Sequence, residues 1–260
     1  MHSFIQRVQE NATRLKHHVC LGLDPDPALM PHHYPKSIEG IRSFLWDVID
    51  ATKNNVVAYK PNMAFFEVWG IEGIALLQDL RKAIPAQVPI ILDAKRGDIG
   101  NTSAKIASYL IDYLKADAIT LHPYMGLDSL LPFFNYKDCF HFVLGLTSNP
   151  GAKEFECLRL SNQDYVYDAV LNACRNWHHT YGNVGAVVGA THDFMSLRLK
   201  YPELFFLVPG VGFQGARYED VIHQTDNKMT LVNITRELLF FSKEKDYLDL
   251  LIQKLLSYST

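Results

Sequence analysis

The stretch VPIILDAKRGD at residues 88–98 is the part of the sequence that decides the fold. Its first half is apolar and β-branched, which is typical of an interior strand of a parallel sheet. Its second half places Asp93, Lys95 and Asp98 where that strand should end. Asp93 and Lys95 are two residues apart, so in a strand their side chains face the same side. Because isolated buried charges are strongly unfavourable, we expect these groups to be paired or to lie at a solvated mouth.

Composition limits the class of protein. We predict one domain, residues 1–260, because the chain has 260 residues and its hydrophobic content of 48% is ample for a full core. The net charge of −3, without a basic stripe, argues against nucleic-acid binding. No apolar run approaches the ~18 residues of a membrane span, and the N-terminus lacks a signal-peptide core. The four cysteines lie far apart without a CxxC pair, so we expect reduced thiols in a cytoplasmic protein.

Short apolar runs recur along the whole chain with helix-like stretches between them. Eight such runs are strand candidates: residues 18–23, 56–59, 88–92, 118–121, 141–146, 184–189, 204–208 and 230–234. Amphipathic segments separate most of them, at residues 41–53, 73–84, 103–115 and 164–178. This alternation predicts an α/β protein with a (β/α)8 TIM barrel. A doubly wound open sheet remains the alternative, because spacing alone does not separate the two folds.

Polar residues gather where these strands end. The set Lys60, Asp93, Lys95 and Asp98 comes from two neighbouring strands, and its charges sum to zero. Such a set can share a partly dry site without a net charge penalty. In a barrel, the loops after the strands form the active site, so these four are the candidate catalytic residues. The structural alternative is an ion-pair network that merely closes the barrel top.

The glycine-rich stretch VPGVGFQG at residues 208–215 contains the pattern GxGxxG. A dinucleotide site would place this pattern early in the chain, with an acidic residue ending the next strand. Here it is late, and the next strand ends in Asn233. We therefore predict a phosphate-binding loop, with a bidentate contact from Arg236 after the last strand.

Metal and nucleophile patterns are missing from the sequence. Three pairs of the eleven histidines are adjacent and would point apart, and neither HxxxH nor HExxH occurs. The sequence has no GxxxxGK[ST] loop and no GxSxG. We therefore expect no metal ion and no P-loop nucleotide.

The stretch DAKRGDIGNT at residues 93–102 resembles the signature of the orotidine 5′-phosphate decarboxylase family, in the branch with DAKRGDIxxT. The likeness extends over most of the chain and follows the family's order. It includes LGLDPD at 21–26, KPN at 60–62, FFE at 65–67, TSNPG at 147–151, VGAT at 188–191 and residues 208–215. The resemblance implies a homodimeric barrel without a cofactor, which converts orotidine 5′-phosphate to uridine 5′-phosphate and carbon dioxide. This is the last step of de novo pyrimidine synthesis.

The resemblance also implies catalytic roles. Lys95 would protonate C6 as carbon dioxide leaves, Asp93 would sit near the departing carboxylate, and Lys60 would order the set. Asp98 and Thr102 would enter the neighbouring subunit's site. Orotate phosphoribosyltransferase, which supplies the substrate, is a candidate partner.

The resemblance further implies a set of substrate contacts. They are Asp24, Asn62, Ser148, Gln214 and Arg236, together with Lys60. Asp24 and Lys60 would bind ribose hydroxyls, Ser148 the pyrimidine edge, and Gln214 and Arg236 the phosphate. Two positions depart from the family pattern: Thr235, where a small residue is more common, and His122. The first leaves the geometry of the phosphate pocket open.

Two alternative functions remain. A magnesium-dependent sugar-phosphate decarboxylase or aldolase of the same barrel superfamily carries a similar DxKxxD motif, but tends to have a glutamate where this chain has Lys60. A non-catalytic barrel that binds a phosphate ligand is the other alternative. It would not need both carboxylates near a ligand carboxylate.

Overall fold

The computed structural model describes residues 2–212, 215–222 and 229–259. Its strands are β1 (Val19–Leu23), β2 (Ala58–Pro61), β3 (Ile91–Arg96), β4 (Ala118–Leu121), β5 (Phe140–Leu146), β6 (Val184–Val188), β7 (Phe206–Pro209) and β8 (Thr230–Ile234). They pair in parallel in the order β2-β1-β8-β7-β6-β5-β4-β3. Parallel bridges from Tyr59 to Ile90 and from Asn62 to Asp93 join β2 to β3 and close the ring. The fold is therefore a (β/α)8 barrel, as predicted, and not an open sheet.

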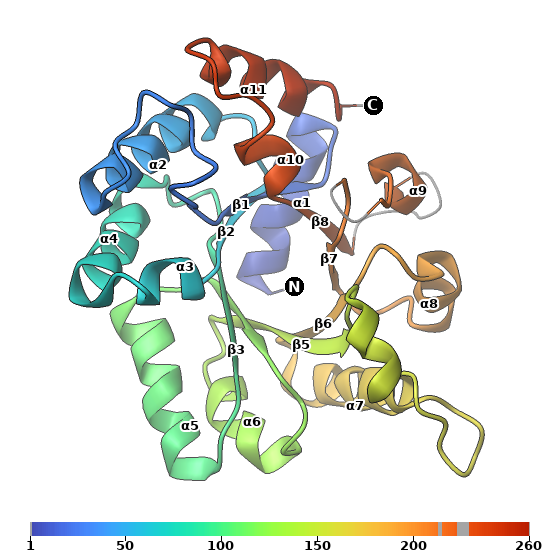
Figure 1. The fold of residues 1–260 in the computed structure, drawn as a ribbon. Helices are drawn as coiled ribbons and strands as arrows, with labels where there is room; N and C mark the ends of the chain where they lie inside the picture. The colour runs from blue at the N-terminus through green and yellow to red at the C-terminus, as the bar shows by residue number, and fades with distance from the viewer. Residues whose placement is uncertain (1, 213–214, 223–228, 260) are drawn as a thin grey trace.

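Helices surround this ring and form its outer layer (Figure 1). The α-helices are α1 (Ser3–Leu15), α2 (Ile38–Thr52), α3 (Ala64–Glu67), α4 (Gly70–Ala83), α5 (Gly100–Ala107), α6 (Leu127–Phe134), α7 (Val166–Tyr181), α8 (Phe194–Lys200), α9 (Tyr218–Ile222), α10 (Arg236–Leu239) and α11 (Tyr247–Leu256). A π-helical turn, η1 (Ser108–Tyr113), continues α5, and a 3-10 turn, η2 (Pro150–Glu154), follows β5. Within the described ranges, none of these helices is long and apolar enough to cross a bilayer.

The N-terminal helix α1 closes one end of the barrel and lies behind the ring of strands in Figure 1. Phe4, Ile5 and Val8 join a buried cluster with inward-facing strand residues such as Phe140 and Phe142. The rings of Phe4 and Phe140 stack at 5.3 Å. Because Phe140 begins β5, this cluster fills the N-terminal end of the barrel and leaves the C-terminal end for polar groups.

Strands β2 and β3 extend further than their apolar runs predict. The sequence places their ends at residues 59 and 92, but β2 includes Lys60, and β3 continues through Asp93, Lys95 and Arg96. Lys60 and Asp93 pair with each other inside the ring, whereas Lys95, which also contacts Asp93, departs from the extended conformation. Asp93, Lys95 and Arg96 therefore belong to β3 itself, whereas Asp98 lies beyond its end.

Candidate active site

Strand alternation decides which side chains enter the barrel. Cys20, Ala58, Ile91 and Ala118 belong to the inner apolar cluster. Side chains two positions further along a strand share the same face. This rule places Gly22, Lys60, Asp93 and Thr120 on the inner face, nearer the C-terminal end of the barrel. Strands β1 to β4 thus place a glycine, an ammonium, a carboxylate and a hydroxyl at the same height inside the barrel.

Asp93 is the centre of this cluster. Its Oδ2 accepts from Lys60 Nζ at 2.7 Å, and its Oδ1 accepts from Lys95 Nζ at 2.5 Å. The hydroxyl of Thr120 also donates to Oδ1, at 2.9 Å. The Lys60 side chain is 5% exposed and that of Lys95 is 48% exposed. Lys60 is therefore an internal anchor, whereas Lys95 faces the solvent-filled mouth.

The paired charges set the protonation states of the buried groups. Burial alone would raise the pKa of Asp93, but the ammonium groups of Lys60 and Lys95 outweigh it and hold that pKa well below its ordinary value. Burial alone would lower the pKa of Lys60, yet the carboxylates of Asp93 and Asp24 raise it. Burial raises the pKa of Asp24, against the opposing charge of Lys60. Asp93 is thus ionised and Lys60 protonated at neutral pH.

Lys95 has an unusual backbone conformation. Its φ is 46°, which lies in the left-handed region that residues other than glycine and asparagine seldom adopt. The pairing of β3 with β4 shifts register at the same place, between Leu92 and Arg96. Strained backbone of this kind persists only where the surrounding structure holds it, and it is concentrated at functional sites.

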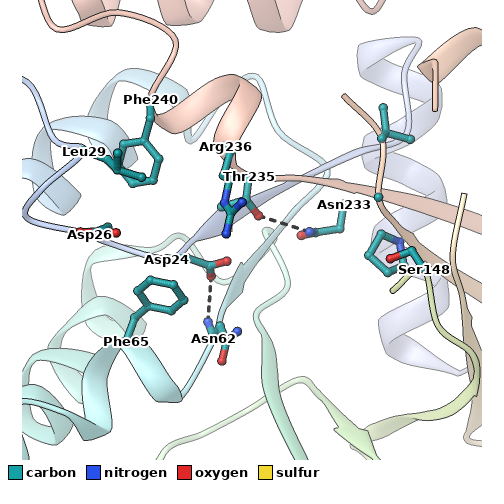
Figure 2. A pocket seen from close by; sticks show the side chains of 13 residues that line it. Asp24, Asp26, Leu29, Asn62, Phe65, Ser148, Asn233, Thr235, Arg236 and Phe240 are labelled. Carbon is teal, nitrogen blue, oxygen red and sulfur yellow. Dashed lines mark hydrogen bonds between the residues drawn. The ribbon is translucent and has the colours of Figure 1, made fainter. Parts of the chain in front are cut away.

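A pocket of about 310 Å³ lies at the same end of the barrel as the charged cluster. Figure 2 shows the residues that line it. Its lining residues are Asp24, Asp26, Leu29, Asn62, Phe65, Ser148, Pro209, Gly210, Val211, Asn233, Thr235, Arg236 and Phe240. The structure therefore brings four predicted contacts together: Asp24, Asn62, Ser148 and Arg236. Asn62 connects the pocket to the cluster, because it pairs with Asp93 and its backbone N–H donates to Asp24 Oδ1 at 3.1 Å.

The loop after β7 forms one wall of the pocket through Gly210 and Val211. Gly210 has a φ of 99°. A side chain at Gly212 would meet Glu237 Oε2 at 1.7 Å. Gly212 also has a positive φ, of 81°, so the path of the loop favours glycine at both positions. Phosphate binding by this loop stays a prediction. Gln214, the other predicted phosphate contact, lies outside the described residues.

Thr235 occupies the space left by a glycine. A Cβ on Gly22 would lie 1.9 Å from Thr235 Oγ1, so β1 must carry glycine at this position. The Thr235 hydroxyl also accepts from Asn233 Nδ2 at 3.3 Å (Figure 2). The departure from the family pattern at Thr235 is therefore accommodated inside the pocket wall.

Asp98 and Thr102 lie apart from this cluster within one chain. The Asp98 carboxylate accepts from the backbone N–H of Ile99 at 2.7 Å, and in the described part of the chain no ion pair joins it to a lysine. Thr102 is exposed on α5 and does not line the pocket. Within one chain, the second carboxylate that acts on Lys60 is Asp24. Of the predicted set, Lys60, Asp93 and Lys95 thus lie together within one chain, and Asp24 takes the position of the second carboxylate instead of Asp98.

Sequence reasoning missed Thr120, and it assigned no role to Phe65 or Asn233, which line the pocket. Thr120 was detectable as a polar residue at an inward position of β4, two residues after Ala118. His122 lies outside the pocket lining, with its ring against Gly97. Over the residues that the structure describes, no cluster of three or more His, Cys, Asp or Glu side chains could hold a metal ion.

Comparison with known sequences places these motifs in a family. Residues 17–239 match the family model described as Orotidine 5'-phosphate decarboxylase / HUMPS family. The orotidine 5′-phosphate decarboxylase of Herpetosiphon aurantiacus is 42% identical over 92% of this chain and 90% of its own length. That of Roseiflexus castenholzii is 41% identical over 94% of this chain and 92% of its own length.

Solved structures agree with this assignment. The orotidine 5′-phosphate decarboxylase of Leishmania donovani is 36% identical, with a TM-score of 0.83 over 99% of this chain and 98% of that chain. UMP synthase of the same organism is 37% identical, with a TM-score of 0.86 over all of this chain, but the match spans only 57% of that longer chain. The chain therefore belongs to the orotidine 5′-phosphate decarboxylase / HUMPS family.

Proposed function

We propose that this enzyme decarboxylates orotidine 5′-phosphate to uridine 5′-phosphate and carbon dioxide without a cofactor. The observation that carries the proposal is the Lys60–Asp93–Lys95 cluster, which is held beside a pocket at the C-terminal end of the barrel. The relatives that share 41–42% of their residues with this chain carry the name of that activity. We further propose that the chain works as one domain, at the last step of pyrimidine synthesis.

Lys95 supplies the proton in this mechanism. Loss of carbon dioxide leaves a carbanion at C6 with little resonance stabilisation. A fixed ammonium beside C6 stabilises that charge, and one such preorganised group is worth ~10²–10³ in rate. The ammonium then donates its proton to C6. Lys95 suits this role because its side chain is half exposed, whereas Lys60 is buried against Asp93.

The pocket residues hold the rest of the substrate. We propose that Asp24 and Lys60 bind the ribose hydroxyls, and that Ser148 and Asn62 contact the base end. Arg236 and Gln214 bind the phosphate, together with backbone N–H groups of the glycine loop. Phosphate binding far from C6 then supplies remote binding energy that orders the reacting end.

Asp98 completes the site from a neighbouring subunit in this proposal. Among the described residues of one chain, no ion pair joins its carboxylate to Lys95, although both follow Asp93 closely in sequence. A homodimer that inserts Asp98 and Thr102 into the partner's site would supply the missing negative charge. Such a site requires a two-fold interface in which each subunit completes the other.

Mixing two inactive variants tests the shared site. Lys95→Ala and Asp98→Ala proteins are each expected to be inactive alone. After random subunit exchange, half of the dimers are mixed, and each has one intact site of two. We therefore expect about a quarter of wild-type activity. No recovery after proven subunit exchange would contradict the shared site.

The magnesium-dependent alternative is disfavoured by Lys60. Its ammonium points at Asp93 from the β2 position and would repel a metal ion there. The deciding experiment follows the absorbance of orotidine 5′-phosphate in the presence of EDTA. We expect undiminished loss of absorbance and formation of uridine 5′-phosphate. Activity that disappears with EDTA would favour the metal-dependent alternative, and binding without turnover would favour the non-catalytic one.

We propose a cytoplasmic enzyme that receives its substrate from orotate phosphoribosyltransferase. The structural match to part of a UMP synthase supports this setting, because the name of that protein says that it forms UMP. Co-purification of the two proteins at physiological salt would test their association.

A further inference from the structure

Thr120 faces an irregular part of the sheet beside the catalytic cluster. Leu92 of β3 pairs with Ile119 of β4, and Arg96 pairs with Leu121. Three residues of β3 therefore oppose the single residue Thr120. Extra residues of this kind leave backbone groups without partners in the strand ladder. The backbone N–H of Lys95 is one such group, and it donates to Thr120 Oγ1 at 3.0 Å.

The direction of these hydrogen bonds is fixed by chemistry. The backbone N–H of Lys95 can only donate, so Thr120 Oγ1 accepts there. The hydroxyl proton is then available for Asp93 Oδ1, which lies 2.9 Å away and, being ionised, can only accept. One hydroxyl group thus links the backbone of Lys95 to the carboxylate that binds the Lys95 ammonium.

We propose that Thr120 is a positioning residue for the decarboxylation, which aligns Asp93 and Lys95 without touching the substrate. Asp93 Oδ1 receives both the Thr120 hydroxyl and the Lys95 ammonium, so the hydroxyl fixes the rotation of the carboxylate, and the carboxylate fixes the ammonium. Thr120 is suited to this because it is 2% exposed and β-branched, with a stiff side chain. The inference rests on the proposed function.

Removing the hydroxyl should affect the reaction and not the binding of the nucleotide. Without it, Lys95 N–H faces a methyl group, and Asp93 keeps only its two lysine contacts. The carboxylate and the ammonium can then rotate together, and small misplacements of a reacting group reduce rates strongly. Thr120 does not line the pocket, so the affinity for uridine 5′-phosphate should not change.

The test compares Thr120→Val, which removes the hydroxyl at nearly constant volume, with Thr120→Ser, which keeps it. We expect kcat to fall about 10-fold to 100-fold in Thr120→Val, as for the loss of a hydrogen bond to a charged group. The dissociation constant of uridine 5′-phosphate should stay within about threefold, since no pocket contact is lost. Thr120→Ser should restore kcat to within about threefold of wild type, because its hydroxyl can make both bonds.

Unchanged kcat in Thr120→Val would overturn the positioning role, and so would a serine variant as slow as the valine variant. A parallel loss of nucleotide affinity would also overturn it, because that would indicate a general structural defect. If Thr120→Val does not fold in a denaturation assay, Thr120→Ala replaces it in the comparison with serine. Wild-type protein that leaves orotidine 5′-phosphate unchanged would instead refute the proposed function.

Discussion

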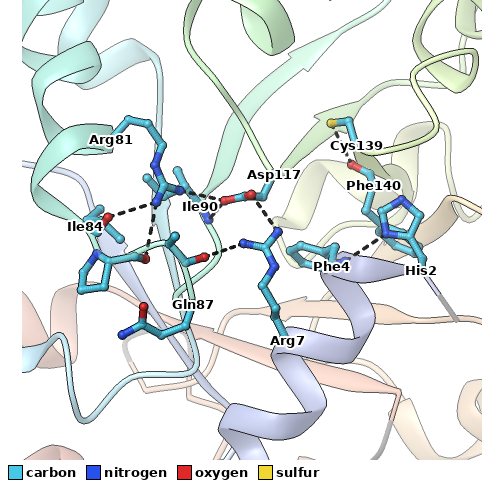
Figure 3. Close-up of polar contacts among 12 residues, drawn as sticks. His2, Phe4, Arg7, Arg81, Ile84, Gln87, Ile90, Asp117, Cys139 and Phe140 are labelled. Atoms are coloured by element: carbon cyan, nitrogen blue, oxygen red, sulfur yellow. Dashed lines mark hydrogen bonds and ion pairs between the residues drawn. The ribbon is translucent and has the colours of Figure 1, made fainter.

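Each end of the barrel has an aspartate held by two cations, and the cations differ between the ends. At the C-terminal end, Lys60 and Lys95 hold Asp93. At the N-terminal end, Arg7 and Arg81 hold Asp117, at 2.7 and 2.9 Å (Figure 3). The two clusters have the same charges, so charge alone does not distinguish a reactive site from a structural one.

The arginine cluster is saturated by further hydrogen bonds. Asp117 Oδ2 also accepts from the backbone N–H of Ile90 at 2.8 Å. Arg7 donates to the carbonyl of Ala86, and Arg81 to that of Ile84 (Figure 3). A guanidinium does not release a proton at accessible pH. This cluster therefore links α1 and α4 to the strands. In contrast, Lys95 is half exposed and can still contact a ligand.

The largest expected effect is that of Lys95→Ala on turnover. The variant loses the proton donor, and a positioned acid is typically worth ~10²–10⁴ in rate. Uridine 5′-phosphate should still bind, because the pocket lining is intact. Steady-state kinetics and product-binding titration check both points. The exposed Lys105→Ala on α5 is the control and should behave as wild type. A Lys95→Ala variant with more than roughly a tenth of wild-type turnover would refute the role.

The second prediction concerns the other end of the barrel. Asp117→Ala leaves two arginines without their partner, and we expect it to lower the free energy of unfolding by about 2–3 kcal/mol, which is less than for a fully buried pair. Turnover per folded molecule should stay within about twofold, because the cluster lies far from the pocket. Denaturant unfolding measures the loss. The control is Asp50→Ala, which removes an exposed ion pair worth ~1 kcal/mol or less.

The third prediction uses pH to separate the two ends. Burial lowers the pKa of His141 to about 3 and that of His17 to about 4, and both lie near the N-terminal ends of strands. The unfolded chain binds these protons near the ordinary value of about 6.5. Stability should therefore fall as the pH drops below that value, by up to ~1.4 kcal/mol per pH unit for each histidine.

Asp93 acts in a different pH range. Its lowered pKa contributes stability above the ordinary aspartate value, and this contribution is lost only as the pH falls below about 3.9. Unfolding free energies between about pH 7 and pH 5 should thus depend on His141 and His17. His141→Gln should flatten the slope, whereas the exposed His179→Gln should not. An unchanged slope in His141→Gln would contradict the assignment.

The smallest expected effects come from added methyl groups. Gly22→Ala, at the C-terminal end, collides with Thr235 and should raise KM a few-fold, with a loss of stability of about 1–3 kcal/mol. Gly185→Ala collides with Phe205 and Phe140 at the other end and should reduce stability alone. Adding Thr235→Gly to Gly22→Ala should restore KM, because it removes the colliding side chain. Persistent impairment in the double variant would show that the contact is not responsible.

The barrel was predictable because its apolar runs occur eight times with helical spacing. The ends of β2 and β3 were not, because Lys60 and Asp93 remain in the strands only through partners distant in sequence. The helix α1 was also missed. Its apolar residues Phe4, Ile5 and Val8 have helical spacing, but they are diluted by polar neighbours.

The candidate site was partly predictable from its motifs. Lys60, Asp93 and Lys95 meet as expected, and Asp24, Asn62, Ser148 and Arg236 line one pocket. Thr120 could not be assigned a role from sequence, because its importance depends on the register shift opposite Lys95. The Arg7–Asp117 pair joins residues 110 positions apart, which no local pattern indicates. The insertion of Asp98 into a second subunit's site stays a prediction.

The central claim is that the lysine end performs chemistry while the arginine end holds the fold. It is tested most directly by the kcat of Lys95→Arg for orotidine 5′-phosphate, with Arg81→Lys as the matched exchange at the other end. Lys95→Arg keeps the positive charge but cannot give up a proton, so we predict a loss of ~10²-fold or more. Arg81→Lys should keep kcat within about twofold. Near wild-type turnover in Lys95→Arg would contradict the account.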